Sequence, residues 1–205
     1  ARGREGMNFR FFKSGTGIDR WLVLAAILMV TLASASETAL NFATGLMVRR
    51  EYGLAVDELR RILEENPEFE QMDRVLFRLG ECHYQTDAPQ KALRLFEQLI
   101  EQYPTSPECP QALYRAGQIQ VTEAPENAAR AFARLADRFP EHNLAPTARY
   151  WAGEAFLRAS IHPQAEAQFR RALEDFPEME SAEQARFGLA MAVFHQPDRF
   201  ADALK

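Results

Sequence analysis

The sequence lacks almost every pattern that marks an enzyme, a metal site or a β-sheet. Its 205 residues contain no Gly-rich phosphate or dinucleotide turn, no Gly-x-Ser-x-Gly and no HExxH. The histidines, His83, His142, His162 and His195, form no metal-ligand cluster with the two cysteines. Period-2 runs of β-branched residues are missing after residue 35. We therefore expect no catalytic residue, no bound metal, no cofactor and no strands.

Basic charge is also scarce outside the N-terminus. The formal net charge is −5, and residues 1–35 carry five basic and two acidic side chains. The rest of the chain therefore has 19 basic against 27 acidic residues. Such a body repels phosphate backbones, so nucleic acid is not an expected partner.

Residues 1–35 are typical of an N-terminal extension followed by an export signal. A basic segment begins at Met7, an apolar run covers residues 21–30, and residues 33–35 read Ala-Ser-Ala, a small-x-small cleavage pattern. Counted to residue 35, the apolar stretch of about 15 residues is shorter than the ~20 that a membrane-spanning helix needs. We expect cleavage before Ser36 and a periplasmic location. The alternative is an uncleaved anchor that holds residues 36–205 at the inner membrane, facing the periplasm.

The strongest pattern is an internal repeat with spacings of 36 or 37 residues. In each copy an alanine is followed four residues later by a large apolar residue and eight residues after that by a proline. A fifth alanine of the series is Ala201. Coincident series at one period indicate a tandem array. The series are Ala55, Ala92, Ala128 and Ala165, then Leu59, Phe96, Phe132 and Phe169, then Pro67, Pro104, Pro140 and Pro177.

Each period contains two amphipathic helices, here named helix A and helix B. Apolar residues between 90 and 103 recur at i, i+3, i+4 and i+7, with polar residues opposite. Pro89, Pro125 and Pro163 stand where the first turn of a helix tolerates a missing N–H, and the recurring prolines end each helix B. We expect an all-α solenoid of tandem helix-turn-helix units, stacked as a right-handed superhelix. About five repeats are predicted, near residues 37–70, 71–107, 108–143, 144–180 and 181–205, the last one truncated.

Small residues should control how these helices pack. Gly80, Gly117 and Gly153 recur in helix A and let it approach its own helix B closely. The same register places Cys109 about ten residues away from Cys82 along equivalent helices, an offset of about 15 Å. A disulfide needs Cα atoms within about 7 Å, so we expect two separate buried or half-buried thiols.

The order Ala-x-Tyr-x-x-Gly, Ala, Phe and Pro, with its spacings, resembles the tetratricopeptide repeat over residues 37–205. The resemblance implies a non-catalytic scaffold that binds other proteins, as a peptide or a helix, in a concave groove lined by helices A. The loop after each proline, as in residues 104–108, is similar to loops of periplasmic members. Those members include proteins of the Tol-Pal system and of outer-membrane β-barrel assembly. An envelope scaffold is therefore the expected function.

The resemblance also implies which residues face the groove. Aromatic residues of helices A and the polar residues four positions after them are expected there, although the aromatic rings could instead pack adjacent helices A. The candidate partner-binding residues are Phe77, Glu81, Tyr114, Gln118, Tyr150, Glu154 and Phe187.

Two alternatives to a free envelope scaffold stay open. The repeat pattern stops inside the fifth helix B, and no polar capping helix follows. We therefore expect a fragment, which could be the repeat region of a larger envelope enzyme with its catalytic domain after Lys205. The other alternative is a membrane-tethered adaptor with an uncleaved N-terminal segment.

Overall fold

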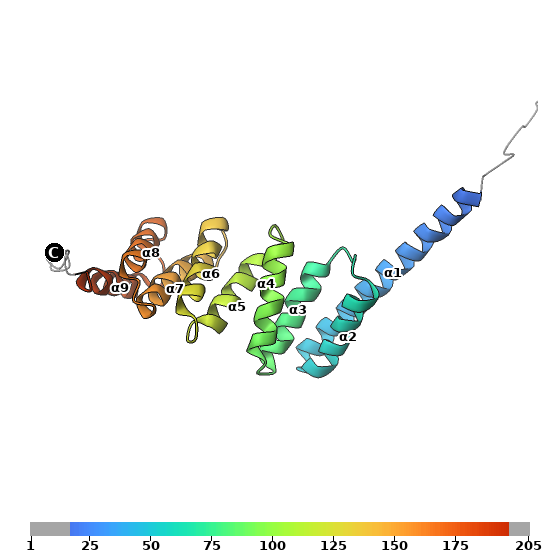
Figure 1. Ribbon diagram of the computed structural model, residues 1–205, viewed down its shortest axis with the longest axis horizontal. Coiled ribbons are helices and arrows are strands. Elements are labelled where there is room, and N and C mark those ends of the chain that lie inside the picture. The colour runs from blue at the N-terminus through green and yellow to red at the C-terminus, as the bar shows by residue number, and fades with distance from the viewer. Residues whose placement is uncertain (1–16, 197–205) are drawn as a thin grey trace, which may run out of the picture.

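The computed structural model describes residues 17–196, and every regular element within them is an α-helix (Figure 1). The described helices follow one another as antiparallel hairpins, as the sequence predicted. They are α1 (Gly17–Val48), α2 (Tyr52–Glu65), α3 (Met72–Gln85), α4 (Pro89–Gln102), α5 (Cys109–Gln120), α6 (Pro125–Arg138), α7 (Ala145–Arg158), α8 (His162–Asp175) and α9 (Ala182–Phe194).

The hairpins stack side by side in chain order. Figure 1 shows them as a row that runs from α1 to α9. Each helix packs mainly on its two neighbours in the chain, and helix A also reaches the next helix A where α1 meets α3 and α7 meets α9. Helices A are the C-terminal part of α1, then α3, α5, α7 and α9, while α2, α4, α6 and α8 are helices B. The predicted all-α solenoid is confirmed. The fifth helix B, expected around Ala201, lies outside the described residues, as does the basic segment after Met7.

Prolines set the limits of helices B as expected. Pro89 and Pro125 begin α4 and α6, and Pro163 lies in the first turn of α8. Each helix B ends two residues before the recurring proline, because proline cannot continue the hydrogen-bond ladder. The expected repeat limits after the first fall in the loops between hairpins.

The core runs continuously along the stack. Its largest fully buried side chains are the helix-B phenylalanines Phe96, Phe132 and Phe169. At Gly80 a β-carbon would lie 2.6 Å from the ring of Phe96, so only glycine permits this approach of α3 to α4. Phe169 also lies against Gly188 of the next hairpin, which joins the two units. The expected close approach of helix A to its own helix B at the glycines is confirmed.

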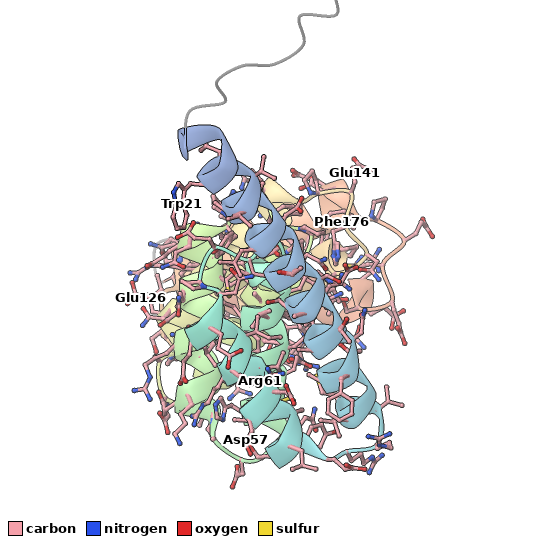
Figure 2. All side chains as sticks on the ribbon, turned by 90° about the vertical axis from the view of Figure 1, so that its right-hand side faces the viewer. Trp21, Asp57, Arg61, Glu126, Glu141 and Phe176 are labelled. Carbon is pink, nitrogen blue, oxygen red and sulfur yellow. The ribbon has the colours of Figure 1, made fainter. Side chains whose placement is uncertain are left out.

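Helix α1 has two parts with different surroundings. Beyond residue 36 it packs on α2, and Asn66 donates a hydrogen bond to the buried Ser36 hydroxyl at 3.2 Å. Before it, the helix continues past the hairpins with exposed Trp21, Leu24 and Leu28 (Figures 1 and 2). The predicted cleavage point thus lies inside a continuous helix. Within residues 17–196 no helix has the length and apolarity needed to cross a membrane.

The two cysteines are free and buried, as expected. Cys82 lies in α3, and Cys109 is the first residue of α5.

Candidate partner-binding face

The aromatic residues predicted on helices A pack against the helix-B phenylalanines. The ring centroids of Phe77 and Phe96 are 5.8 Å apart, and those of Tyr114 and Phe132 are 5.5 Å apart. Phe77 is only 5% exposed. It is therefore a core residue, which corrects its expected place in the groove. The rings also pack on their own helix B rather than mainly between helices A.

The remaining aromatic positions are more accessible. Tyr114 and Tyr150 are half-buried, and the ring centroid of Tyr150 lies 6.1 Å from that of Phe169. Phe187 in α9 is 70% exposed. These three rings are therefore within reach of a partner, and Phe187 is the most exposed of them.

Glu81 and Gln118 are brought together by a residue that the sequence analysis did not single out. Arg115 of α5 donates two hydrogen bonds to the Glu81 carboxylate of α3, at 2.8 and 3.2 Å. It donates a third to Gln118, at 2.9 Å, and its guanidinium lies 5.0 Å from the ring centroid of Tyr84. Arg115 thus spans adjacent helices A, fixing two predicted groove residues in place. The sequence signal for this ion pair was its spacing, because Arg115 follows the acidic Glu81 by 34 residues.

The third polar residue of the series, Glu154, has different surroundings. No Lys, Arg or His nitrogen of the described residues lies within 4.0 Å of its carboxylate, although Arg158 stands one turn further along α7. Burial raises the pKa of Glu154, while Arg158 and a hydrogen bond with Tyr150 act in the opposite direction. Burial, followed by the Glu154 charge, likewise raises the pKa of Tyr150. The carboxylate is therefore half-buried and near Arg158, but it has no ion pair within 4.0 Å among the described residues.

Glu154 lines a cavity of about 430 Å³ between α7, α8 and α9. Two imidazoles stack at its edge, those of His162 and His195, with ring centroids 5.0 Å apart. No group of three or more metal-binding side chains occurs in the described part of the chain.

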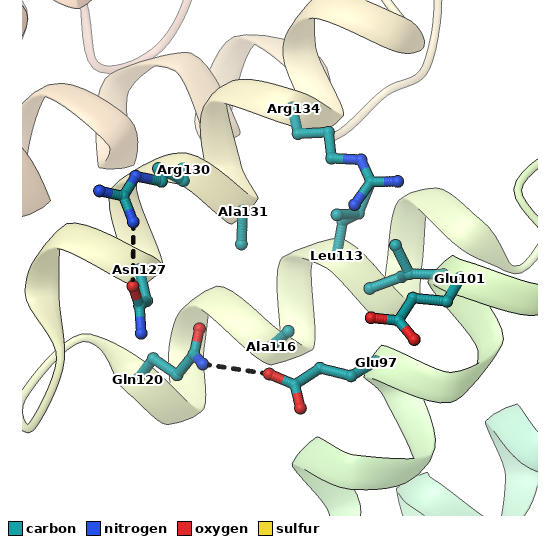
Figure 3. Close-up of a pocket in the computed structure, with 10 residues that line it drawn as sticks. Glu97, Glu101, Leu113, Ala116, Gln120, Asn127, Arg130, Ala131 and Arg134 are labelled. Carbon is teal, nitrogen blue, oxygen red and sulfur yellow. Dashed lines mark hydrogen bonds between the residues drawn. The ribbon is translucent and has the colours of Figure 1, made fainter.

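A second groove of about 260 Å³ lies between the helices B α4 and α6, over α5 (Figure 3). Glu97 and Glu101 line it from α4, and Arg130 and Arg134 line it from α6, so its two walls carry opposite charge. Gln120 of α5 donates a hydrogen bond to Glu97 at 3.4 Å. Burial and the charge of Glu101 raise the pKa of Glu97.

Two family models, both described as tetratricopeptide repeat, match the sequence. One matches residues 74–106, and the other matches residues 123–180 and 162–205. Together these segments make up more than half of the chain. The chain belongs to the tetratricopeptide repeat family. Repeat solenoids of this kind use extended concave surfaces for binding.

Several solved structures share this fold. A crystal structure of MamA protein has a TM-score of 0.64 at 15% identity, over 82% of this chain and 86% of that chain. MamA AMB-1 has a TM-score of 0.60 at 18% identity, over 85% and 87%. YrrB, described as a tetratricopeptide protein with an unusual peptide-binding site, has a TM-score of 0.62 at 18% identity, over 81% and 79%. No curated protein sequence matches the chain. At these identities the likeness establishes the fold.

Proposed function

We propose that this chain is a non-catalytic interaction scaffold of the bacterial cell envelope that binds a segment of a partner protein on its helix-A face. The observation that carries this proposal is the row of half-buried polar and aromatic groups on successive helices A. Tyr114 and Gln118 of α5 are followed by Tyr150, Trp151 and Glu154 of α7. An extended peptide or a helix can contact such side chains on one helix A after another.

Trp151 is the strongest anchor on this face. It takes the position of Arg115 one repeat later, is half-buried, and its ring centroid lies 5.5 Å from that of Tyr150. Tryptophan and tyrosine offer a large contact area at low conformational entropy, and both are frequent at binding hot spots. The likeness to YrrB, whose description names a peptide-binding site, agrees with this proposal.

Selection from a displayed peptide library, followed by calorimetry, tests the binding role. We expect peptides that bind the 205-residue chain and that lose about tenfold or more in affinity with Trp151→Ala, a typical hot-spot cost. Glu174→Ala, at an exposed position of helix B α8, is the matched control and should leave affinity unchanged. Equal affinity of both variants would reject the helix-A face as the binding surface.

The envelope location is supported by how α1 is divided. Cleavage before Ser36 would leave residues 36–48 as helix A of the first hairpin, comparable in length to the 12 to 14 residues of the other helices A. These residues include Leu40 and Leu46, which are buried, whereas Trp21, Leu24 and Leu28 are exposed. The basic start, apolar run and small-x-small pattern are those of an export signal.

Mass spectrometry of the chain expressed with its N-terminal segment in a Gram-negative bacterium tests the location. We expect a mature periplasmic protein that starts at Ser36. Replacing a small residue of the pattern, as in Ala35→Leu, should block cleavage and leave the precursor at the inner membrane. An intact chain in the cytosol would contradict export, and an intact wild-type chain in the membrane fraction would favour the tethered adaptor.

A further inference from the structure

Equivalent positions of successive helices A carry different residues. The polar series is Glu81, Gln118 and Glu154, with spacings of 37 and 36 residues. Arg115 pairs with Glu81, and the position of Arg115 is taken in the following helices A by Trp151 and Gly188, with spacings of 36 and 37 residues. The position thus carries a guanidinium at Arg115, an indole at Trp151 and no side chain at Gly188.

Gly188 lies beside a cavity. It has no side chain, and a β-carbon there would meet the Phe169 ring of α8, so this position supplies no group that could pair with Glu154. The cavity of about 430 Å³ opens beside it, lined by Glu154, Leu157 and Met191. The other lining residues are Ser160, His162, Phe187 and His195.

The arrangement around Arg115 shows what fits such a position. Its guanidinium pairs with the Glu81 carboxylate at 2.8 and 3.2 Å, and it lies over Tyr84. In the α7–α9 groove Glu154 takes the place of Glu81, and Leu157 takes the place of Tyr84. The carboxylate is present and partly desolvated, yet no cation of the described residues lies within 4.0 Å of it. A carboxylate in this state gains from a charge-assisted hydrogen bond.

We propose that the cavity between α7 and α9 is a subsite for an arginine side chain of the partner protein, with Glu154 as its carboxylate. The guanidinium binds Glu154 in the manner in which Arg115 binds Glu81. Leu157 and Met191 pack against the aliphatic part of the incoming side chain, whose methylenes favour apolar contact. Arginine is preferred over lysine because its planar fork matches a carboxylate at two points. This inference rests on the proposed function for the nature of the partner.

Nuclear magnetic resonance with Nα-acetyl-arginine methylamide as the probe tests the subsite on the whole chain. We expect saturable shifts at Leu157, Gly188 and Met191. The citrulline analogue, which has the same shape without the charge, should give none. Glu154→Gln should weaken the arginine probe about tenfold, as expected for loss of a charge-assisted pair. Shifts that persist with citrulline, an unchanged probe affinity in Glu154→Gln, or no shifts in the wild type would overturn the proposal.

A second variant should create a new binding site for the arginine probe. Arg115→Ala removes the internal guanidinium from the first groove, so the same probe should then also shift the Tyr84 and Glu81 signals, which it leaves unchanged in the wild type. Absence of this second response in a folded Arg115→Ala protein would contradict the equivalence of the two grooves and overturn the proposal.

The peptide selection separates this inference from the proposed function. Selected peptides enriched in arginine, with affinity that depends on Glu154, support both. Selected peptides without basic enrichment, whose affinity is unchanged in Glu154→Gln, leave the scaffold role intact and reject the subsite. Failure to select any peptide rejects the scaffold role, while the probe measurement still decides whether the cavity binds a guanidinium.

Discussion

Gly117 of α5 lies against the ring of Phe132 so closely that a β-carbon at residue 117 would stand 2.7 Å from two ring atoms. Phe132 is 1% exposed, and the neighbouring Ala128, Leu135 and Ala136 of α6 are fully buried around it. The ring therefore has no free volume into which it could move. The contact between these two residues sets the distance between the two helices of the hairpin.

Replacing Gly117 by alanine should destabilise the array. The added methyl group overfills a packed core, at a cost of about 1–3 kcal/mol that exceeds the gain in helix propensity of about 1 kcal/mol. Chemical unfolding followed by circular dichroism measures the change. Gly45→Ala is the control, because a β-carbon at Gly45 meets nothing within 4 Å and should stabilise the protein. Equal stabilisation by both changes would contradict a close Gly117–Phe132 contact.

Sequence periodicity was sufficient to predict the close approach of helix A to its own helix B, because the glycine recurs at a fixed position in every unit. The contact at Gly80 repeats at Gly117 and Gly153, so the pattern reports a geometry that all units share. Likewise the prolines predicted where helices B begin and end, because proline acts locally on the backbone.

The binding face was less predictable because it depends on what differs between units. Phe77 and Phe187 occupy equivalent positions, yet one is buried in the core and the other is 70% exposed. Arg115 forms an ion pair with Glu81 between helices, and the motif of a single helix cannot indicate such a pair. The sequence predicted the residue positions, while their exposed fractions and ion pairs required the three-dimensional contacts.

The Arg115–Glu81 pair should couple α3 to α5. The two side chains are partly buried and meet at two points, so a double-mutant cycle with Arg115→Ala and Glu81→Ala should give a coupling energy of about 1 kcal/mol. The unfolding free energies of the four proteins supply this value. The exposed pair of Arg61 and Glu65, at 3.4 Å, is a matched comparison and should couple more weakly. Additive single changes at Arg115 and Glu81 would show that the pair does not join the helices.

A second ion pair between repeats involves a buried arginine. Arg149 of α7 is 4% exposed and pairs with Asp137 of α6 at 2.7 Å, while Asp175 of α8 lies farther away, at 3.8 Å. Asp137→Asn should cost about 2 kcal/mol, because it leaves the guanidinium poorly compensated in a site that water barely reaches. Asp175→Asn should cost less.

The double change Asp137→Asn with Arg149→Met separates this electrostatic cause from lost packing. Methionine keeps much of the side-chain volume and removes the buried charge, so most of the lost stability should return. Urea unfolding of the three proteins measures the difference. If the double variant is as unstable as the sum of its parts, burial of the charge is not the cause.

Buried thiols should make the stability of the array fall in alkaline solution. Burial, followed by the Glu81 charge, raises the pKa of Cys82 to about 11, and burial also raises the pKa of Cys109. A thiol in the unfolded chain titrates near ~8.5. Above this pH the unfolded chain loses protons that the folded chain keeps. Each thiol therefore lowers the free energy of unfolding by about 1.4 kcal/mol per pH unit until its folded pKa is reached.

Comparison of the wild type with Cys82→Ala between pH 8 and pH 11 isolates the Cys82 contribution, because lysines and tyrosines titrate in both proteins. The stability difference between the two proteins should shrink as the pH rises, since the alanine variant lacks the ionisable group. At pH 8 both thiols should also resist Ellman's reagent in the folded chain and react fully in denaturant. A stability difference that is constant across this range, together with rapid labelling of the native protein, would show that Cys82 is exposed to water and ionises normally.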